Sequence, residues 1–62
     1  MNNAQVEGSW NQLKGEAKRV WGDLTDDDFT RAEGSAEKLV GIIQERFGDA
    51  SESIRNRLRR WI

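Results

Sequence analysis

The sequence predicts an all-α fold: a compact bundle of three to four helices, arranged as two helical hairpins over one core. Apolar residues recur at spacings of three and four along most of the chain, which has no proline and no alternating apolar pattern. All six glycines also form two equally spaced triplets, namely Gly8, Gly15, Gly22 and Gly34, Gly41, Gly48. The shift that carries Gly8 onto Gly34 superposes the triplets, which indicates an internal repeat.

The same shift, here called the repeat shift, aligns the residues around the glycines. Glu7-Gly8-Ser9 meets Glu33-Gly34-Ser35, Leu13 meets Leu39, Trp21-Gly22-Asp23 meets Phe47-Gly48-Asp49, and Thr25-Asp26 meets Ser51-Glu52. Each unit is too small to bury its own apolar face, so the two must pack against each other within one helical domain, residues 1–62. The chain has no cysteine or histidine, so helix pairing has to supply the stability of this small core.

The first helix is expected to run from a cap at Asn2 or Asn3 to Trp21. Its apolar side chains fall within an arc of about 100° on a helical projection. They are Val6, Trp10, Leu13, Ala17, Val20 and Trp21. Gly22 suits the left-handed conformation that closes many helices.

The second helical region begins after Thr25, whose hydroxyl can cap it, while three aspartates in the first turn complement the helix dipole. The Gly34-Ser35 pair either kinks one long helix or separates two. We favour two helices, at about 26–33 and about 35–47, ending before Gly48. The apolar positions of this region are Phe29, Ala32, Ala36, Leu39, Val40, Ile43 and Phe47.

The last helix is expected to begin at a Ser51 cap, with Glu52 in its first turn, and to continue to the end of the sequence. Its apolar face comprises Ile54, Leu58, Trp61 and Ile62. We expect all three tryptophans, Trp10, Trp21 and Trp61, to pack in the core, because large aromatic side chains fill a thin core well.

The residue types present do not indicate an enzyme. Activated nucleophiles need a neighbouring base, and Ser9, Thr25, Ser35 and Ser51 are better explained as helix caps or solvent-facing residues. Asp23, Asp26, Asp27 and Asp28 lack the alternating spacing and the glycine of a calcium loop. We therefore expect no catalytic residue, cofactor, metal site or small-molecule substrate.

Charge is unevenly distributed along the chain: residues 1–22 carry +1, residues 23–52 carry −6 and residues 53–62 carry +4. The basic end contains Arg55, Arg57, Arg59 and Arg60. These arginines either form a solvated face favoured at a helix C-terminus, or belong to a basic amphipathic helix that contacts an anionic membrane or nucleic acid. No stretch approaches the ~20 apolar residues that span a bilayer. We expect a cytoplasmic monomer.

Four segments carry a family resemblance, and they are Gly8-Ser9-Trp10-Asn11-Gln12-Leu13-Lys14-Gly15, Trp21-Gly22-Asp23-Leu24-Thr25-Asp26-Asp27-Asp28, Glu33-Gly34 and Leu39-Val40-Gly41-Ile42-Ile43-Gln44-Glu45-Arg46-Phe47-Gly48. In them the chain resembles the CsbD-like family of small bacterial proteins associated with general stress responses. The resemblance implies two packed helical hairpins, stress-induced expression and no established molecular activity. We therefore expect a non-enzymatic stress protein that either protects other proteins or binds a protein partner. The four C-terminal arginines depart from the acidic final helix common in the family, so no function of that helix transfers.

Overall fold

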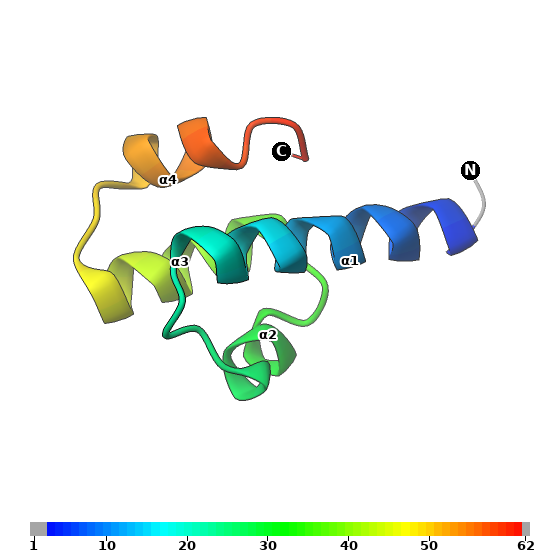
Figure 1. Ribbon diagram of the computed structural model, residues 1–62, viewed down its shortest axis with the longest axis horizontal. Coiled ribbons are helices and arrows are strands. Elements are labelled where there is room, and N and C mark those ends of the chain that lie inside the picture. Colours follow the sequence, from blue (N-terminus) through cyan, green and yellow to red (C-terminus); the bar gives the residue numbers. More distant parts are fainter. Residues whose placement is uncertain (1–2, 62) are drawn as a thin grey trace.

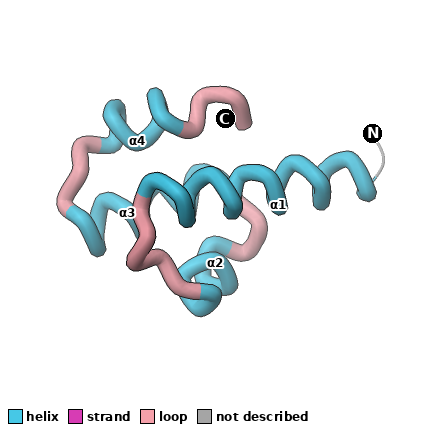
Figure 2. The backbone as a smooth tube through the Cα atoms, in the orientation of Figure 1, coloured by secondary structure: helices cyan, strands magenta, loops and turns pink. Residues whose placement is uncertain are grey.

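The computed structural model describes the backbone of residues 3–61 and the side chains of residues 9–61. Its helices are α1 (Asn3–Val20), α2 (Asp26–Ala32), α3 (Ala36–Phe47) and α4 (Ser51–Arg57), and the described residues contain no strand (Figure 2). The all-α prediction is confirmed. The expected cap at Asn2 and the expected apolar positions Val6 and Ile62 lie outside what is described.

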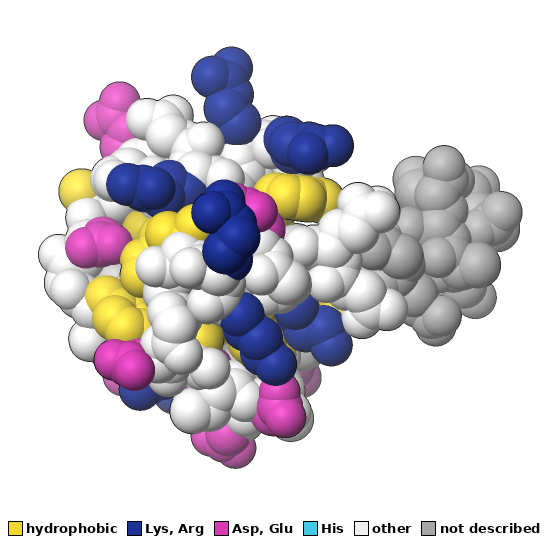
Figure 3. Space-filling model, in the orientation of Figure 1, with side chains coloured by type: hydrophobic (Ala, Val, Ile, Leu, Met, Phe, Trp, Pro, Cys, Tyr) yellow, Lys and Arg dark blue, Asp and Glu magenta, His cyan; other side chains and the backbone are white. Residues whose placement is uncertain are grey.

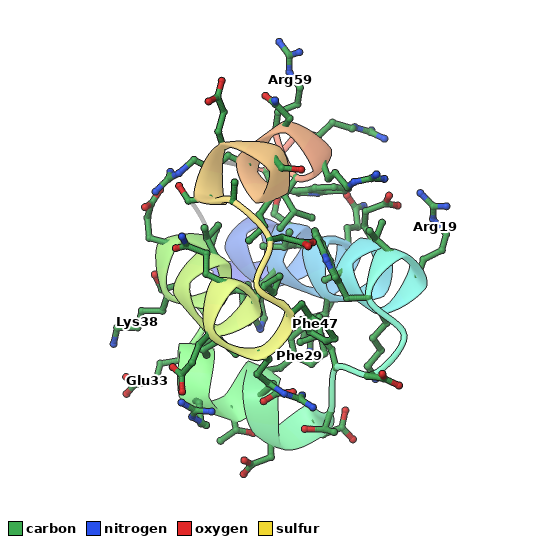
Figure 4. All side chains as sticks on the ribbon, turned by 90° about the vertical axis from the view of Figure 1, so that its left-hand side faces the viewer. Arg19, Phe29, Glu33, Lys38, Phe47 and Arg59 are labelled. Atoms are coloured by element: carbon green, nitrogen blue, oxygen red, sulfur yellow. The ribbon has the colours of Figure 1, made fainter. Side chains whose placement is uncertain are left out.

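Helices α1 and α3 lie beside each other and point in the same direction, while α2 and α4 cover opposite sides of this pair (Figures 1 and 4). Helix α3 contacts both α2 and α4. The repeat shift carries α2 onto α4 and the C-terminal part of α1 onto α3, with the helix ends nearly in register. The two hairpins α1–α2 and α3–α4 are therefore the two units of the sequence repeat.

The core draws on all four helices. Its buried apolar residues are Leu13, Ala17, Trp21, Leu24, Phe29, Ala32, Leu39, Val40, Ile42, Ile43, Ile54 and Leu58. Leu24 and Ile42 were not among the positions expected from the helical spacing. Of the three tryptophans, Trp21 is buried, whereas Trp10 and Trp61 pack against the core but remain partly exposed. The prediction that all three pack in the core is confirmed for Trp21 and holds only in part for the other two.

The junction between α2 and α3 confirms the predicted break. Glu33, with φ of 54°, and Gly34, with φ of 76°, take the left-handed conformation and reverse the chain. Ser35 then caps α3, because its hydroxyl accepts the Lys38 N–H at 3.2 Å. At the other end of α3, Gly48 has φ of 74° and its N–H donates to the Gln44 carbonyl at 2.9 Å, as expected for a helix-closing glycine.

Gly22 does not play the part that the sequence predicts for it. Helix α1 ends at Val20, and Gly22 is not among the left-handed residues of the described chain. The chain turns instead through a hydrogen bond from the Leu24 N–H to the Trp21 carbonyl at 3.0 Å, which requires no positive φ at the glycine. Equivalent glycines of the repeat thus have different conformations.

The last helix also differs from its prediction at both ends. Ala50, not Ser51, occupies the cap position of α4 and makes no side-chain cap hydrogen bond. The helix ends at Arg57, because the Leu58 N–H is shared between the Ile54 and Arg55 carbonyls at 3.1 and 3.2 Å, a tightening common in final turns. Residues 58–61 therefore form turns rather than a continuation of the helix.

Candidate interaction surface

The structure separates the four arginines predicted as a binding surface into one that is paired within the chain and three that are not. Arg55 lies on α4 and donates two hydrogen bonds, of 2.7 and 2.6 Å, to the carboxylate of Glu37 on α3. This fork-shaped contact lowers the pKa of Glu37 and raises that of Arg55, in both cases chiefly through the hydrogen bonds. Arg55 is therefore already paired within the molecule and contributes little to an external contact.

The remaining three, Arg57, Arg59 and Arg60, are here called the C-terminal arginines. All are exposed, and none forms an ion pair with another residue that the structure describes. Arg59 projects away from the molecule in Figure 4, and Lys and Arg side chains gather over α4 and the following turn in Figure 3. The Arg60 guanidinium lies 5.4 Å from the ring centre of Trp61. Positive charge and a partly exposed aromatic ring thus occur together here.

A groove of about 330 Å³ lies between α1 and α2, on the opposite side of the molecule from α4. Trp10 and Phe29 line it, meeting edge to face with their ring centres 6.5 Å apart. Asp26, Thr30 and Glu33 line it from α2 and the residue that follows it. This α1–α2 groove combines an aromatic wall and two exposed carboxylates, which are groups that bind cations, with the amine of Lys14.

The carboxylates of the groove form only weak ion pairs within the chain. Asp26 pairs with Lys18 at 3.1 Å, and Glu33 pairs with Lys38 at 2.6 Å. Their side chains are 94% and 68% exposed, so both pairs are solvated and weak. A cation with better geometry can replace the lysines at little cost.

Sequence reasoning missed this groove because it assigned Trp10 to the interior. The repeat shift pairs Trp10 with Ala36 and Phe29 with Arg55, so the aromatic pair exists in one half only. Phe29 is itself a core residue, so the imbalance shows only that the two halves differ here, and the partial exposure of Trp10 had to come from the structure.

Asp28 is the one buried charged residue of the described chain, and its interactions are structural. Its carboxylate accepts the Thr25 N–H at 3.0 Å, and the Thr25 hydroxyl accepts the Asp28 N–H at 3.2 Å, which completes a capping box. Arg46 of α3 forms an ion pair with the same carboxylate. The Thr25 backbone hydrogen bond, with a smaller contribution from Arg46, lowers the pKa of Asp28.

The residues that follow α1 also contact the end of α3 and the loop after it. The Trp21 indole N–H donates to the Asp49 carboxylate at 2.9 Å, and Arg46 donates to the Asp23 carbonyl at 3.3 Å. Of the aspartates considered as metal ligands, Asp28 completes a helix cap, Asp26 pairs with Lys18, and Asp23 accepts a hydrogen bond through its backbone carbonyl. In the part of the chain that is described, no cluster of three or more acidic side chains is placed to hold a metal ion.

The model of the CsbD-like family matches residues 4–56. The chain belongs to the CsbD-like family. The resemblance seen in the sequence is therefore confirmed, and the family match includes Arg55 but ends before the C-terminal arginines.

Similar proteins in several bacteria carry the name UPF0337. The one from Bordetella pertussis is 54% identical over 59 residues, covering 95% of this chain and 89% of its own. The one from Pectobacterium atrosepticum is 49% identical over 61 residues, covering 98% and 88%. The UPF0337 protein YjbJ of Escherichia coli K12 is 54% identical over 48 residues, covering 77% and 70%. No solved structure matches the CsbD-like chain, and none of its described helices is sufficiently long and apolar to traverse a bilayer.

Proposed function

We propose that this protein is a non-enzymatic stress-response protein that acts through its surface, by protecting other proteins or by binding a partner. Its membership of the CsbD-like family, together with the association of that family with stress responses, is the observation that carries the proposal.

The side chains with reactive potential support a non-catalytic role. The hydroxyls of Thr25 and Ser35 accept backbone hydrogen bonds at helix starts, and the Thr30 hydroxyl donates to the Asp26 carbonyl at 3.0 Å. An activated nucleophile would instead be hydrogen bonded to a side-chain base. The polar groups that can be assigned a role therefore hold helices together.

Protein level and survival in the host bacterium test the stress role. We expect the protein to accumulate during salt shock, ethanol exposure or stationary phase, and a deletion strain to survive at least one of them less well than the complemented strain. Constant protein levels with equal survival under all three conditions would contradict the proposal.

A second measurement distinguishes protection from partner binding. If the protein protects others, an excess of it slows the heat aggregation of an unrelated enzyme more than equal albumin does. If it binds one partner, crosslinking in stressed cells recovers the same complex repeatedly, and the aggregation assay shows no difference from albumin.

The C-terminal arginines support a second candidate, an interaction module that docks on an anionic surface. Arg57, Arg59 and Arg60 lie beside the partly exposed Trp61, and arginine next to an aromatic ring is suited to both lipid headgroups and nucleic acid. Because these contacts would be electrostatic, binding should weaken steeply as salt rises.

Vesicle flotation with phosphatidylglycerol and a gel shift with duplex DNA, both at low salt, test this candidate. The variant Arg57→Gln/Arg59→Gln/Arg60→Gln should lose binding. A control that removes three positive charges from α1, Lys14→Gln/Lys18→Gln/Arg19→Gln, should retain most of it. Equal loss in both variants, or no binding by the unmodified protein to either surface, would eliminate a specific role for the C-terminal arginines.

A further inference from the structure

The repeat places an acidic residue of the first hairpin opposite an arginine of the second. The repeat shift carries Glu33 of the α1–α2 groove onto Arg59, and Gly34 onto Arg60. Both pairs lie just after the second helix of their hairpin, α2 or α4. One of these two surfaces therefore presents two exposed carboxylates, each in a solvated pair with a lysine and with Lys14 beside them, and the other presents guanidinium groups.

These two surfaces are chemically complementary. Guanidinium groups bind carboxylates through paired hydrogen bonds and stack on aromatic rings, and the groove offers Asp26 and Glu33 beside Trp10. All four basic residues of the last ten positions are arginine, whereas the basic residues at the groove are lysines: Lys14 lines it, and Lys18 pairs with Asp26. An arginine can make the paired hydrogen bonds to a carboxylate that a lysine cannot. The pairing of Arg55 with Glu37 shows an arginine of α4 making such a contact within the chain.

A chain cannot bring its own groove and its own Arg59 together. Helices α2 and α4 lie on opposite sides of the α1–α3 pair, and the labelled Glu33 and Arg59 side chains lie toward opposite ends of the view in Figure 4. The complementary surfaces can meet only between two molecules.

We propose that this chain associates head to tail with a second copy of itself, the α1–α2 groove of one molecule receiving Arg59 and Arg60 of the next. The contact is heterologous, because it joins two different surfaces. An open assembly therefore has an unused groove on the molecule at one end and an unused arginine pair on the molecule at the other end. Because each contact uses one small groove, the association is weak, and protein concentration and salt control it.

Sedimentation velocity measures this association directly. We expect the average mass of the unmodified protein to rise with concentration up to about 1 mM in low salt, and to stay at the monomer value when added salt shortens the Debye length. The groove variant Asp26→Asn/Glu33→Gln and the arginine variant Arg59→Gln/Arg60→Gln should each associate at least about fivefold more weakly.

Two controls carry charge changes of the same kind outside the contact. Asp27→Asn alters an exposed aspartate of α2 that does not line the groove, and Arg19→Gln alters an exposed arginine of α1 that does not line it either. Both should associate like the unmodified protein. Circular dichroism on every variant establishes that the helices are retained.

Mixing the two weakened variants gives the decisive result. The groove variant still carries Arg59 and Arg60, and the arginine variant still carries an intact groove, so an equimolar mixture should form a one-to-one complex that grows no further. A monomeric unmodified protein at all concentrations in low salt would overturn the proposal, as would a mixture that stays monomeric or controls as impaired as the groove and arginine variants.

Discussion

Replacing Asp28 with asparagine tests the buried junction between the two hairpins. The change keeps the size of the side chain but removes the negative charge that Arg46 faces, and it weakens the capping box with Thr25. The Asp28 side chain is 5% exposed and that of Arg46 is 34% exposed, so the ion pair is partly shielded from water. The loss should therefore exceed that of an ordinary surface pair.

The expected loss follows from these two contacts. A weakened cap costs about 1 kcal/mol, and a half-buried ion pair contributes about 1 kcal/mol, the upper end of the range for exposed pairs. The total of about 2 kcal/mol is large beside the roughly 3–9 kcal/mol expected for a chain of this length. It corresponds to a fall in Tm of roughly 8–16 °C.

Urea and thermal denaturation, followed by tryptophan fluorescence, to which the buried Trp21 contributes, measure the loss. Asp27→Asn is the matched control, because Asp27 is exposed on the same helix turn and its replacement should change stability by less than about 0.5 kcal/mol. If Asp28→Asn were no more destabilising than Asp27→Asn, the buried network would not stabilise the fold.

Three further predictions have defined outcomes. The folded-state pKa of Asp28 lies below its ordinary value of 3.8, so the ionised carboxylate stabilises the fold fully above pH 3.8 and this stabilisation is lost as pH falls through the folded-state pKa. The free energy of unfolding, measured in urea melts, should therefore fall less between neutral and acidic pH in Asp28→Asn than in the unmodified protein. Gly48→Ala, at φ of 74°, should cost about 1 kcal/mol, whereas Gly41→Ala, inside α3 with no atom within 4 Å of the new methyl, should stabilise by about 0.5–1 kcal/mol in urea melts. Ala50→Ser should supply the missing cap of α4 and raise stability by about 0.5–1 kcal/mol, whereas Ser51→Ala should change it little.

Periodicity and repeat symmetry were sufficient to predict the helices of the fold. The spacing of Leu39, Val40 and Ile43 is set by the helix itself, and each is buried. The break at Gly34 was predictable because a glycine followed by a capping serine favours a chain reversal. Local sequence could not distinguish Gly22 from Gly48, since their different conformations depend on how each turn packs.

The candidate surfaces were less predictable, because they depend on which charges meet. The sequence identifies four C-terminal arginines, but only the packing of α4 on α3 places Arg55 against Glu37. Likewise, the aspartates after Thr25 look alike as first-turn residues, yet Asp28 alone is buried and paired with Arg46. Long-range partners of this kind lie 18 residues apart in both pairs, beyond the reach of local spacing rules.

The divergence of the two repeat units explains both the stability and the surface of the molecule. Asp28 is equivalent to Ile54, which is fully buried, so the same structural position is held by a polar network in one hairpin and by apolar packing in the other. The next position is Phe29 in the first hairpin and Arg55 in the second, so an aromatic side chain in one hairpin corresponds to a charged side chain in the other. A duplicated unit has thus kept its helices while its halves became unlike in charge, so the two halves of the molecule present different surfaces to a partner.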